Sequence, residues 1–467
     1  MAMLDGEAGG ARMRAVMEAI ERRIASRAVS AGDKLPSIRR FAETMNVSPS
    51  TVVAAYDQLV ADGVITARRG AGFFVADAVK PFALAETGPA VEREIDPFWV
   101  ARQSLDADPQ APKPGCGWMP ADWMPIDALR RAVRRLARTE AEVLVDYGST
   151  RGPENLRKLL ARQFAEEGLS ANPEQILLTA AGTQSIDLIC RYFLKPGDTV
   201  VVDDPCYFNF HALLRAHQVK IVGVPALQTG PDCEAFEAVL TRHKPKLYIT
   251  TSAPQNPTGA SPTPPTVHRL LSLAAAHDLI IVEDAIFAGF EPDAAPGLAV
   301  LDGLDRVVRI GSFSKTLSAS VRCGFIAARP DWIEGLIDLQ VATHFGGPSP
   351  VAAELVFGSL SDGSYRKHME ALRLRLAKRR REVAARLSDI GIEAWLMPKG
   401  GFYLWCRLPE GTDSALVARR ALEDGLVLGP GNVFSVSQGL SEFMRFNVSQ
   451  MHGPGIYRRI ARALETR

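Results

Sequence analysis

The residues best suited to chemistry lie in one short segment, G-S-F-S-K at 311–315. Lys315 follows an apolar run and has hydroxyl side chains beside it. A lysine that is desolvated or close to other cations has a lowered pKa and forms a Schiff base with an aldehyde. Ser312 and Arg322 could hold a phosphate group of the same molecule. Taken alone, the segment is a weak signal, because a surface lysine beside serines is the commoner case, so its interpretation depends on the rest of the chain.

Other polar motifs follow one another along the chain in a defined order. They are Tyr147, A-A-G-T-Q at 180–184, D-D-P-C-Y at 203–207, P-Q-N-P-T-G at 254–259, V-E-D-A at 282–285 and M-R-F at 444–446. Each motif alone is a weak signal. With Lys315, the ordered set resembles the fold-type I pyridoxal-phosphate (PLP) enzymes of the aspartate aminotransferase group, over about residues 120–450.

The resemblance implies PLP as cofactor and a role for each motif. The N–H groups of Gly182 and Thr183, at the start of a helix, would bind the phosphate. Tyr207 would stack on the pyridine ring, and Asn256 would donate a hydrogen bond to its phenolate oxygen. Asp284 would pair with the ring nitrogen and keep it protonated, which makes the ring an electron sink.

Three further residues complete the implied site. Lys315 would carry the cofactor as a Schiff base, and Arg445 would bind the α-carboxylate of an amino-acid ligand with both arms of its guanidinium. Tyr147 would reach the phosphate held by a partner subunit, which implies a homodimer. Without this set, Tyr207 would be interpreted as a core aromatic and Arg445 as a surface ion pair.

Two positions depart from the pattern. Relatives usually carry a tyrosine where this chain has Phe287, whose side chain cannot donate to the phenolate oxygen. The pKa of the Schiff base would then be tuned differently, which disfavours efficient transamination. Ala181 replaces a residue that often bears a hydroxyl, so one bond to the phosphate would be lost.

Alternating strands and helices must position these residues. The strand candidates are Q-I-L-L-T-A at 175–180, T-V-V-V-D-D at 199–204, K-I-V-G-V-P at 220–225, K-L-Y-I-T-T at 246–251, L-I-I-V-E-D at 279–284 and V-V-R-I-G-S-F-S at 307–314. Several are continuously apolar, as buried parallel strands are. The order predicts an α/β sheet covered on both faces. From about residue 350, long helices and two strand patterns predict a smaller α+β subdomain.

The first 75 residues form a separate pattern. Apolar residues recur at helical spacing over 13–24, and Ser37 can cap a second, short helix. Ser48 followed by Pro49 is a helix start signal for a third helix. Two β-prone runs around a Gly-rich turn, V-I-T-A-R-R-G-A-G-F-F-V at 64–75, predict a hairpin. This order of elements is that of a winged helix-turn-helix.

The motifs of this unit resemble the GntR class of DNA-binding domains. They are G-D-K-L-P-S-I-R at 32–39, V-S-P-S-T-V at 47–52, A-Y-D-Q-L at 55–59, D-G at 62–63 and G-A-G-F-F-V at 70–75. In a helix-turn-helix the third helix enters the major groove, so Ser50 and Thr51 are expected to read base edges. Arg39, Arg68 and Arg69 are expected to reach phosphates or the minor groove.

Charge supports a nucleic-acid partner for this unit alone. The whole chain has 54 basic and 53 acidic residues, a net charge of +1. Between residues 12 and 75, ten Lys and Arg face six Asp and Glu, so this segment carries about +4. Pro49 stands where relatives commonly have a basic residue, which leaves the operator sequence open.

Composition excludes several classes of protein. With 47% apolar and 23% charged residues the chain is an ordinary globular one. Its six cysteines form no C-x-x-C pair and show no zinc spacing, so we expect reduced thiols and no metal. No run of about 18 apolar residues suggests a membrane span, and the N-terminus has no signal-peptide pattern. These features indicate a cytoplasmic protein.

We therefore expect a winged helix-turn-helix domain at 1–77, an interdomain linker at 78–113 and a PLP-binding α/β domain of fold type I at 114–467, with the small subdomain at about 350–467. This combination resembles the MocR/PdxR family of bacterial transcription regulators. The resemblance implies a homodimeric regulator that binds double-stranded DNA and senses PLP, another B6 vitamer or a small amino compound through Lys315. The alternatives are a working aminotransferase with an appended DNA-binding domain, and a DNA-binding protein whose large domain only dimerises.

Overall fold

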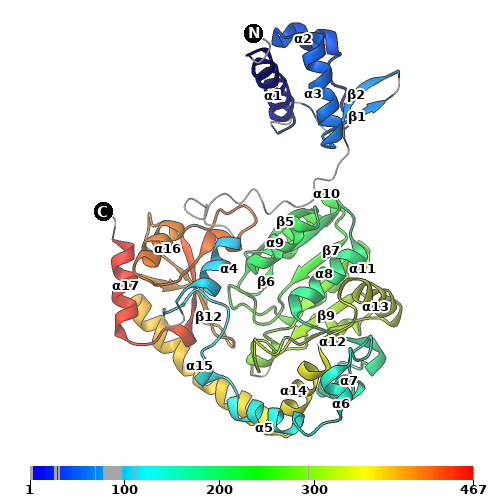
Figure 1. Ribbon diagram of the computed structural model, residues 1–467. Coiled ribbons are helices and arrows are strands. Elements are labelled where there is room, and N and C mark those ends of the chain that lie inside the picture. The colour runs from blue at the N-terminus through cyan, green and yellow to red at the C-terminus, as the bar shows by residue number, and fades with distance from the viewer. Residues whose placement is uncertain are drawn as a thin grey trace. The chain divides into compact units, whose positions relative to one another are not determined.

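The structure is a computed structural model that describes residues 4–25, 29, 32–68, 70–76, 97–108, 111–292 and 294–465. The chain divides into two compact units, Met1–Gly88 and Pro89–Arg467 (Figure 1). Each is considered by itself below. None of the helices in the described ranges is both long enough and apolar enough to cross a lipid bilayer.

The first unit has the predicted winged helix-turn-helix order. It consists of α1 (Leu4–Ala25), α2 (Ile38–Met45), α3 (Pro49–Ala61) and a hairpin of β1 (Ile65–Arg68) and β2 (Gly72–Val75). The hydroxyl oxygens of Ser37 and Ser48 accept hydrogen bonds from the first turns of α2 and α3, as their N-cap positions predict. Buried side chains from all three helices and both strands share one core, in which the Tyr56 hydroxyl donates to the Pro36 carbonyl.

A mixed eight-stranded sheet forms the centre of the second unit. Its strand order is β3-β10-β9-β8-β7-β4-β5-β6. The strands are β3 (Ile176–Thr179), β4 (Thr199–Asp204), β5 (Lys220–Leu227), β6 (Gly230–Pro231), β7 (Leu247–Thr250), β8 (Ile280–Asp284), β9 (Val307–Ser312) and β10 (Gly324–Ala327). All six predicted strands are present. Two were not predicted: β6, and β10, which runs antiparallel between β3 and β9.

Helices cover both faces of this sheet. Val201 packs into one hydrophobic core and its neighbours Val200 and Val202 into the other, because successive side chains of a strand point to opposite faces. The first core also receives residues of α7 (Glu154–Glu166), α10 (Cys233–His243), α11 (Pro264–Ala276), α12 (Leu298–Asp302) and α14 (Pro350–Leu360). The second receives residues of α8 (Gly182–Phe193), α9 (Phe208–Ala216) and α13 (Pro330–His344). The helices α5 (Ile126–Leu136) and α6 (Ala141–Val145) contact α14.

The C-terminal part builds a second, four-stranded sheet in the order β11-β12-β14-β13. Its strands are β11 (Glu393–Ala394), β12 (Tyr403–Arg407), β13 (Gly429–Pro430) and β14 (Phe443–Asn447), accompanied by α15 (Ser364–Ser388), α16 (Ser414–Glu423) and α17 (Pro454–Leu464). Their shared core also takes in Met119, Trp123 and Phe287. Segments far outside the expected subdomain therefore help to build it.

The stretch 78–113, predicted as a linker, contains a helix. This helix is α4 (Pro97–Asp106), labelled in Figure 1. Its buried Val100 belongs to one hydrophobic cluster with Trp405 and Phe434. No sustained periodicity marks this stretch, because most of the apolar partners of α4 lie hundreds of residues away. Residues 78–96 and 109–110 of the same stretch lie outside the described residues.

Candidate functional site

The carboxyl ends of the parallel strands bring the predicted polar residues together. Asp284 and Ser312 are the last residues of β8 and β9, loops or helices that follow β3, β4, β7 and β9 carry most of the others, and Arg445 comes from β14 of the second sheet. Ligands bind at this edge in open α/β sheets. A cavity of about 370 Å³ lies there, and nine of the predicted residues line it: Gly182, Thr183, Tyr207, Asn256, Asp284, Ser312, Lys315, Arg322 and Arg445.

Lys315, which is half-buried, and Asp284, which is buried, are two titratable groups that line the cavity. Burial lowers the pKa of the Lys315 amine to about 8, and the positive charges of Arg445 and Arg322 act in the same direction. Burial raises the pKa of Asp284 to about 7, although the N–H of Ile286 donates to its carboxylate at 3.1 Å. A lysine that is partly neutral near pH 7 is ready to attack an aldehyde.

One end of the cavity is built to receive an anion. Within the described structure, no side chain caps the N-terminus of α8, whose N-cap residue is Ala181. The N–H groups of the first turn, at Gly182 and Thr183, have no partner within a helix and face the cavity. Ser314 and Arg322 line the same cavity, and the Ser314 hydroxyl lies 2.9 Å from that of Ser312.

Arg445 is a buried guanidinium that also lines the cavity. It lies on β14, donates to the Asn256 side-chain oxygen and to the Gly115 carbonyl at 2.8 Å each, and stacks on the Tyr403 ring at 4.1 Å. Its Nε has no hydrogen-bond partner among the described residues. A buried charge with an unused donor favours a carboxylate ligand.

Aromatic side chains form much of the remaining wall. Phe287 is buried and packs edge-on against Tyr403, with ring centroids 5.6 Å apart. The Tyr403 hydroxyl and the Lys315 amine both lie close to Gly117. A Cβ atom added at that glycine would be 3.3 Å from the hydroxyl and 3.6 Å from the amine. Phe287 has no hydroxyl, whereas Tyr403 has one, and it lies near the same glycine as the Lys315 amine. Sequence reasoning missed Tyr403, since nothing in F-Y-L-W marks it as more than a core aromatic.

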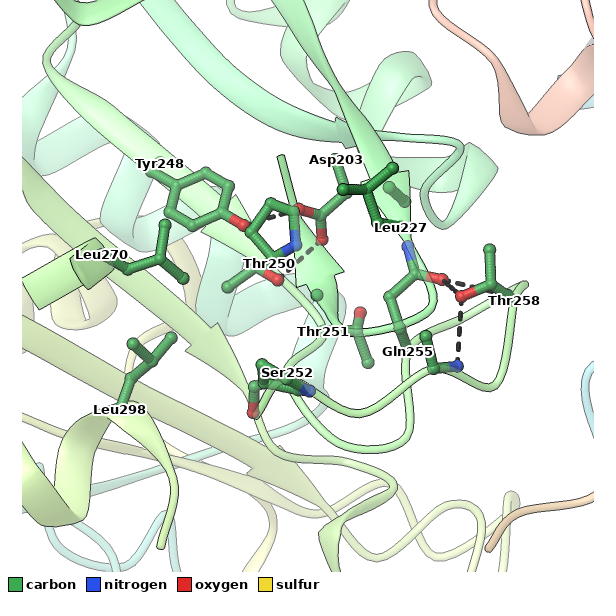
Figure 2. Close-up of a pocket in the computed structure, with 15 residues that line it drawn as sticks. Asp203, Leu227, Tyr248, Thr250, Thr251, Ser252, Gln255, Thr258, Leu270 and Leu298 are labelled. Atoms are coloured by element: carbon green, nitrogen blue, oxygen red, sulfur yellow. Dashed lines mark hydrogen bonds between the residues drawn. The ribbon is translucent and has the colours of Figure 1, made fainter. Parts of the chain in front are cut away.

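A second, smaller pocket lies beside the loop that carries Asn256 (Figure 2). The hydroxyls of Tyr248 and Thr250 donate to the buried carboxylate of Asp203 at 2.5 and 2.7 Å. The Gln255 amide donates to the Pro205 carbonyl at 2.6 Å. Burial raises the pKa of Asp203 to about 6, despite these donors. This network joins β4 and β7 to the residue that precedes Asn256.

Tyr147 does not line the cavity. Its side chain is 73% exposed, and its ring packs against that of the exposed Phe345 at 4.9 Å. Besides Tyr403, the sequence also missed Gly115, Gly117, Trp118 and three residues of α4. These belong to segments that reach the cavity only through tertiary packing. Groups of three or more His, Cys, Asp or Glu able to hold a metal ion do not occur among the described residues.

The predicted DNA contacts lie on the surface of the first unit. Arg39, Ser50 and Arg68 are exposed, and Thr51 is half-buried. The Ser50 and Thr51 hydroxyls lie 2.9 and 2.8 Å from the Ser48 oxygen, so the first turn of α3 is ordered by its own side chains. Arg68 stacks on Phe74 of the wing at 4.4 Å. Arg69 lies outside the described residues.

Comparison with known proteins places both units in families. Residues 120–462 match aminotransferase class I and II, and residues 12–75 match the gntR family of bacterial regulatory proteins. The chain belongs to the aminotransferase class I and II family and carries a GntR-type helix-turn-helix domain in front of it. This is the domain combination of the MocR/PdxR-type regulators that the sequence resembles.

Relatives of two kinds are similar to the chain. The uncharacterized HTH-type transcriptional regulator YdcR of Escherichia coli is 28% identical and covers 93% of this chain and 94% of its own. The 2-aminoadipate transaminase of Thermus thermophilus is 29% identical and covers 75% and 89%. The structure of LysN, an α-aminoadipate aminotransferase from the same organism, has a TM-score of 0.72 at 28% identity and covers 78% of this chain and 94% of its own.

The family implies PLP as cofactor, and the residues of the cavity suit this group. A buried carboxylate on β8, a half-buried lysine of lowered pKa and a helix N-terminus without a side-chain cap match a protonated ring, an aldehyde and a phosphate. Gln184 Nε2, in the first turn of α8, is buried without a hydrogen-bond partner among the described residues. A phosphate acceptor at this end would offer a partner to such a donor.

Proposed function

We propose that the protein is a PLP-dependent, DNA-binding transcription regulator whose aminotransferase-like unit senses PLP or an amino-compound effector. The observation that carries the proposal is the joining, in one chain, of a winged helix-turn-helix with exposed cations and a cavity centred on Lys315. The full-length relatives named as regulators support it.

Different residues of the cavity would bind different parts of the cofactor. Lys315 would hold the cofactor as a Schiff base, which requires the neutral amine that burial favours. Asp284 would keep the ring nitrogen protonated, so that the bound cofactor supplies an electron sink. The first turn of α8, with Ser312, Ser314 and Arg322, would bind the phosphate.

An effector would be recognised by its amine and its carboxylate. The amine would exchange with that of Lys315, and Arg445, held by Asn256, would bind the carboxylate. The effector can alter DNA binding only if its affinity differs between two arrangements of the chain.

A homodimer completes the proposal. Tyr147, Phe345 and Val145 are 73%, 66% and 83% exposed, and the rings of the first two are in contact. Exposed apolar clusters of this kind indicate a protein interface. Tyr147 would then reach the phosphate held by the partner subunit. A dimer would present two recognition helices, so the operator should contain two half-sites.

The second candidate function is aminotransferase activity. The retention of Asp284, Lys315 and Arg445 and the similarity to 2-aminoadipate transaminase favour it. Phe287 weighs against it. The deciding experiment mixes PLP-loaded protein with amino acids and follows absorbance and promoter DNA binding together. A shifted absorbance band with altered DNA affinity and no turnover supports the regulator. Rapid conversion of the cofactor to its amine form with multiple turnovers supports the enzyme instead.

A further inference from the structure

The helix α4 forms one wall of the cavity. Ala101, Ser104 and Leu105 line it, and their i, i+3, i+4 spacing places them on one face of the helix. The helix is held against the rest of the large unit, since its buried Val100 belongs to one hydrophobic cluster with Phe208 and Phe434.

A hydrogen bond holds the C-terminal end of α4 in place. Lys113 Nζ donates to the Ala107 carbonyl, directly after the last turn, at 3.1 Å. Phe208 follows Tyr207 directly and also lines the cavity, so α4 and the aromatic wall pack as one layer.

Leu105 is the unusual residue of this face. Its side chain borders the cavity and yet is 73% exposed. Ala101 beside it is only half-buried. Together with Ile186 and Ile286, which line the same cavity, they offer apolar surface that a ligand side chain could cover.

The charges of the cavity limit the ligand further. Its described lining residues include three cations, Lys315, Arg322 and Arg445. Two of them have roles toward the cofactor in the proposed function, which leaves Arg445 for one ligand carboxylate. The α4 wall contributes no charged side chain to the described lining, so a second carboxylate or an ammonium placed beside it would find no ion-pair partner there, whereas an apolar side chain would cover apolar surface.

We infer that the effector is an amino acid with a single carboxylate and an apolar side chain, and that α4 senses it by packing against that side chain. The inference rests on the proposed function and adds the class of effector and the sensing element. In the chain, α4 is the first described element of the large unit after the DNA-binding unit. A ligand that orders or moves α4 therefore acts directly on the end of the segment that leads to the DNA-binding unit.

The test uses full-length, PLP-loaded protein and titrates it with leucine, phenylalanine, glutamate and lysine, while the absorbance of the bound cofactor is recorded. Wild-type protein should bind leucine and phenylalanine more tightly than glutamate or lysine. Leu105→Glu should weaken leucine binding by about tenfold, the loss expected when roughly half of a leucine side chain's burial energy is removed. The Leu105→Lys variant should shift the preference toward glutamate.

Leu374→Glu is the matched control, because Leu374 lies on α15 outside the cavity lining and is 75% exposed. It should bind all four amino acids as the wild type does. The effect of leucine on promoter DNA affinity should be lost in Leu105→Glu and kept in Leu374→Glu.

The outcomes separate the two proposals. Protein that takes up no PLP would overturn the proposed function. Protein that takes up PLP and binds DNA, but prefers glutamate or lysine or is insensitive to Leu105→Glu and Leu105→Lys, would overturn the inference about α4 and leave the proposed function standing.

Discussion

The Arg445 guanidinium donates to the Asn256 side-chain oxygen at 2.8 Å, across the boundary between the two sheets of the large unit. Asn256 lies in the loop after β7 and Arg445 on β14. The hydrogen bond therefore joins the residue proposed to contact the cofactor to the residue proposed to bind the effector carboxylate, so ligand binding at either one should be felt by the other.

The first prediction concerns Arg445→Lys. Lysine keeps the charge and loses the second arm of the fork, so amino-acid binding should weaken by about 10- to 100-fold, as expected for loss of a charge-assisted hydrogen bond. PLP uptake should change little. Spectral titration with amino acids measures the first quantity and cofactor content after dialysis the second. Equal loss of both would remove Arg445 from the effector site.

The second prediction concerns the pH dependence of cofactor uptake. Schiff-base formation needs the neutral amine, and the pKa of Lys315 is lowered to about 8 from the ordinary 10.5. The rate of PLP uptake by apoprotein should therefore rise with pH and level off above about 8, whereas an ordinary lysine would still be gaining at about pH 10. Stopped-flow absorbance measures this rate. Lys315→Ala should give no band at all, and a persistent band would refute the assignment.

The third prediction concerns Phe287→Tyr. A phenol at this position could donate to the phenolate oxygen of the cofactor, which weakens the attraction of that oxygen for the Schiff-base proton. The pKa of the Schiff base should fall, and half-transamination of amino acids should become faster. A pH titration of the absorbance band provides the measurement. Tyr403→Phe is the companion variant, because it removes a hydroxyl that lies close to Gly117, as the Lys315 amine does.

The fourth prediction concerns DNA binding. Arg39→Ala should reduce promoter affinity by about tenfold at low salt and lower the slope of log K against log salt by about 0.9, the value for one phosphate contact. PLP content should be unchanged. Arg458→Ala, an exposed arginine of α17, is the control and should leave both DNA measurements unaltered. A joint loss of DNA and PLP binding in Arg39→Ala would contradict the division into two units.

The fifth prediction concerns Asp203. Its pKa is raised to about 6 in the folded chain from the ordinary 3.8, so the folded state holds the proton more tightly. The corresponding stability is complete below about pH 4 and is lost as pH rises through about 6. In Asp203→Asn this contribution is absent. Thermal unfolding of both proteins from about pH 4 to about pH 8 should show the wild type losing stability relative to the variant; a constant difference would contradict the raised pKa.

Local signals predicted much of the fold. Ser48 and Pro49 mark the start of α3 because capping and a fixed φ act within one turn. The strand T-V-V-V-D-D coincides with β4 because a buried parallel strand needs a continuous apolar run. The ordered polar motifs led to nine residues of the cavity, and all but Arg445 end or follow strands of the central sheet whose carboxyl ends meet.

Non-local packing accounts for what the sequence did not reveal. The strand β10 is short, begins with Gly324 and owes its place to pairing with β3 and β9 on both sides. The helix α4 depends on Trp405 and Phe434, and Tyr403 becomes a cavity residue only because β12 pairs with the strand that carries Arg445. None of these relationships has a period or spacing that the local sequence could display.

The antiparallel course of β10 has a mechanical consequence. Lys315 and Arg322 both lie on the single excursion that leaves the sheet at Ser312 and re-enters it at Gly324. A cofactor bound both to the amine of Lys315 and to the guanidinium of Arg322 would cross-link the two parts of this segment. Loss of the cofactor would then make this segment more flexible. The protein without cofactor and the protein with cofactor would differ in rigidity at the place where the effector binds.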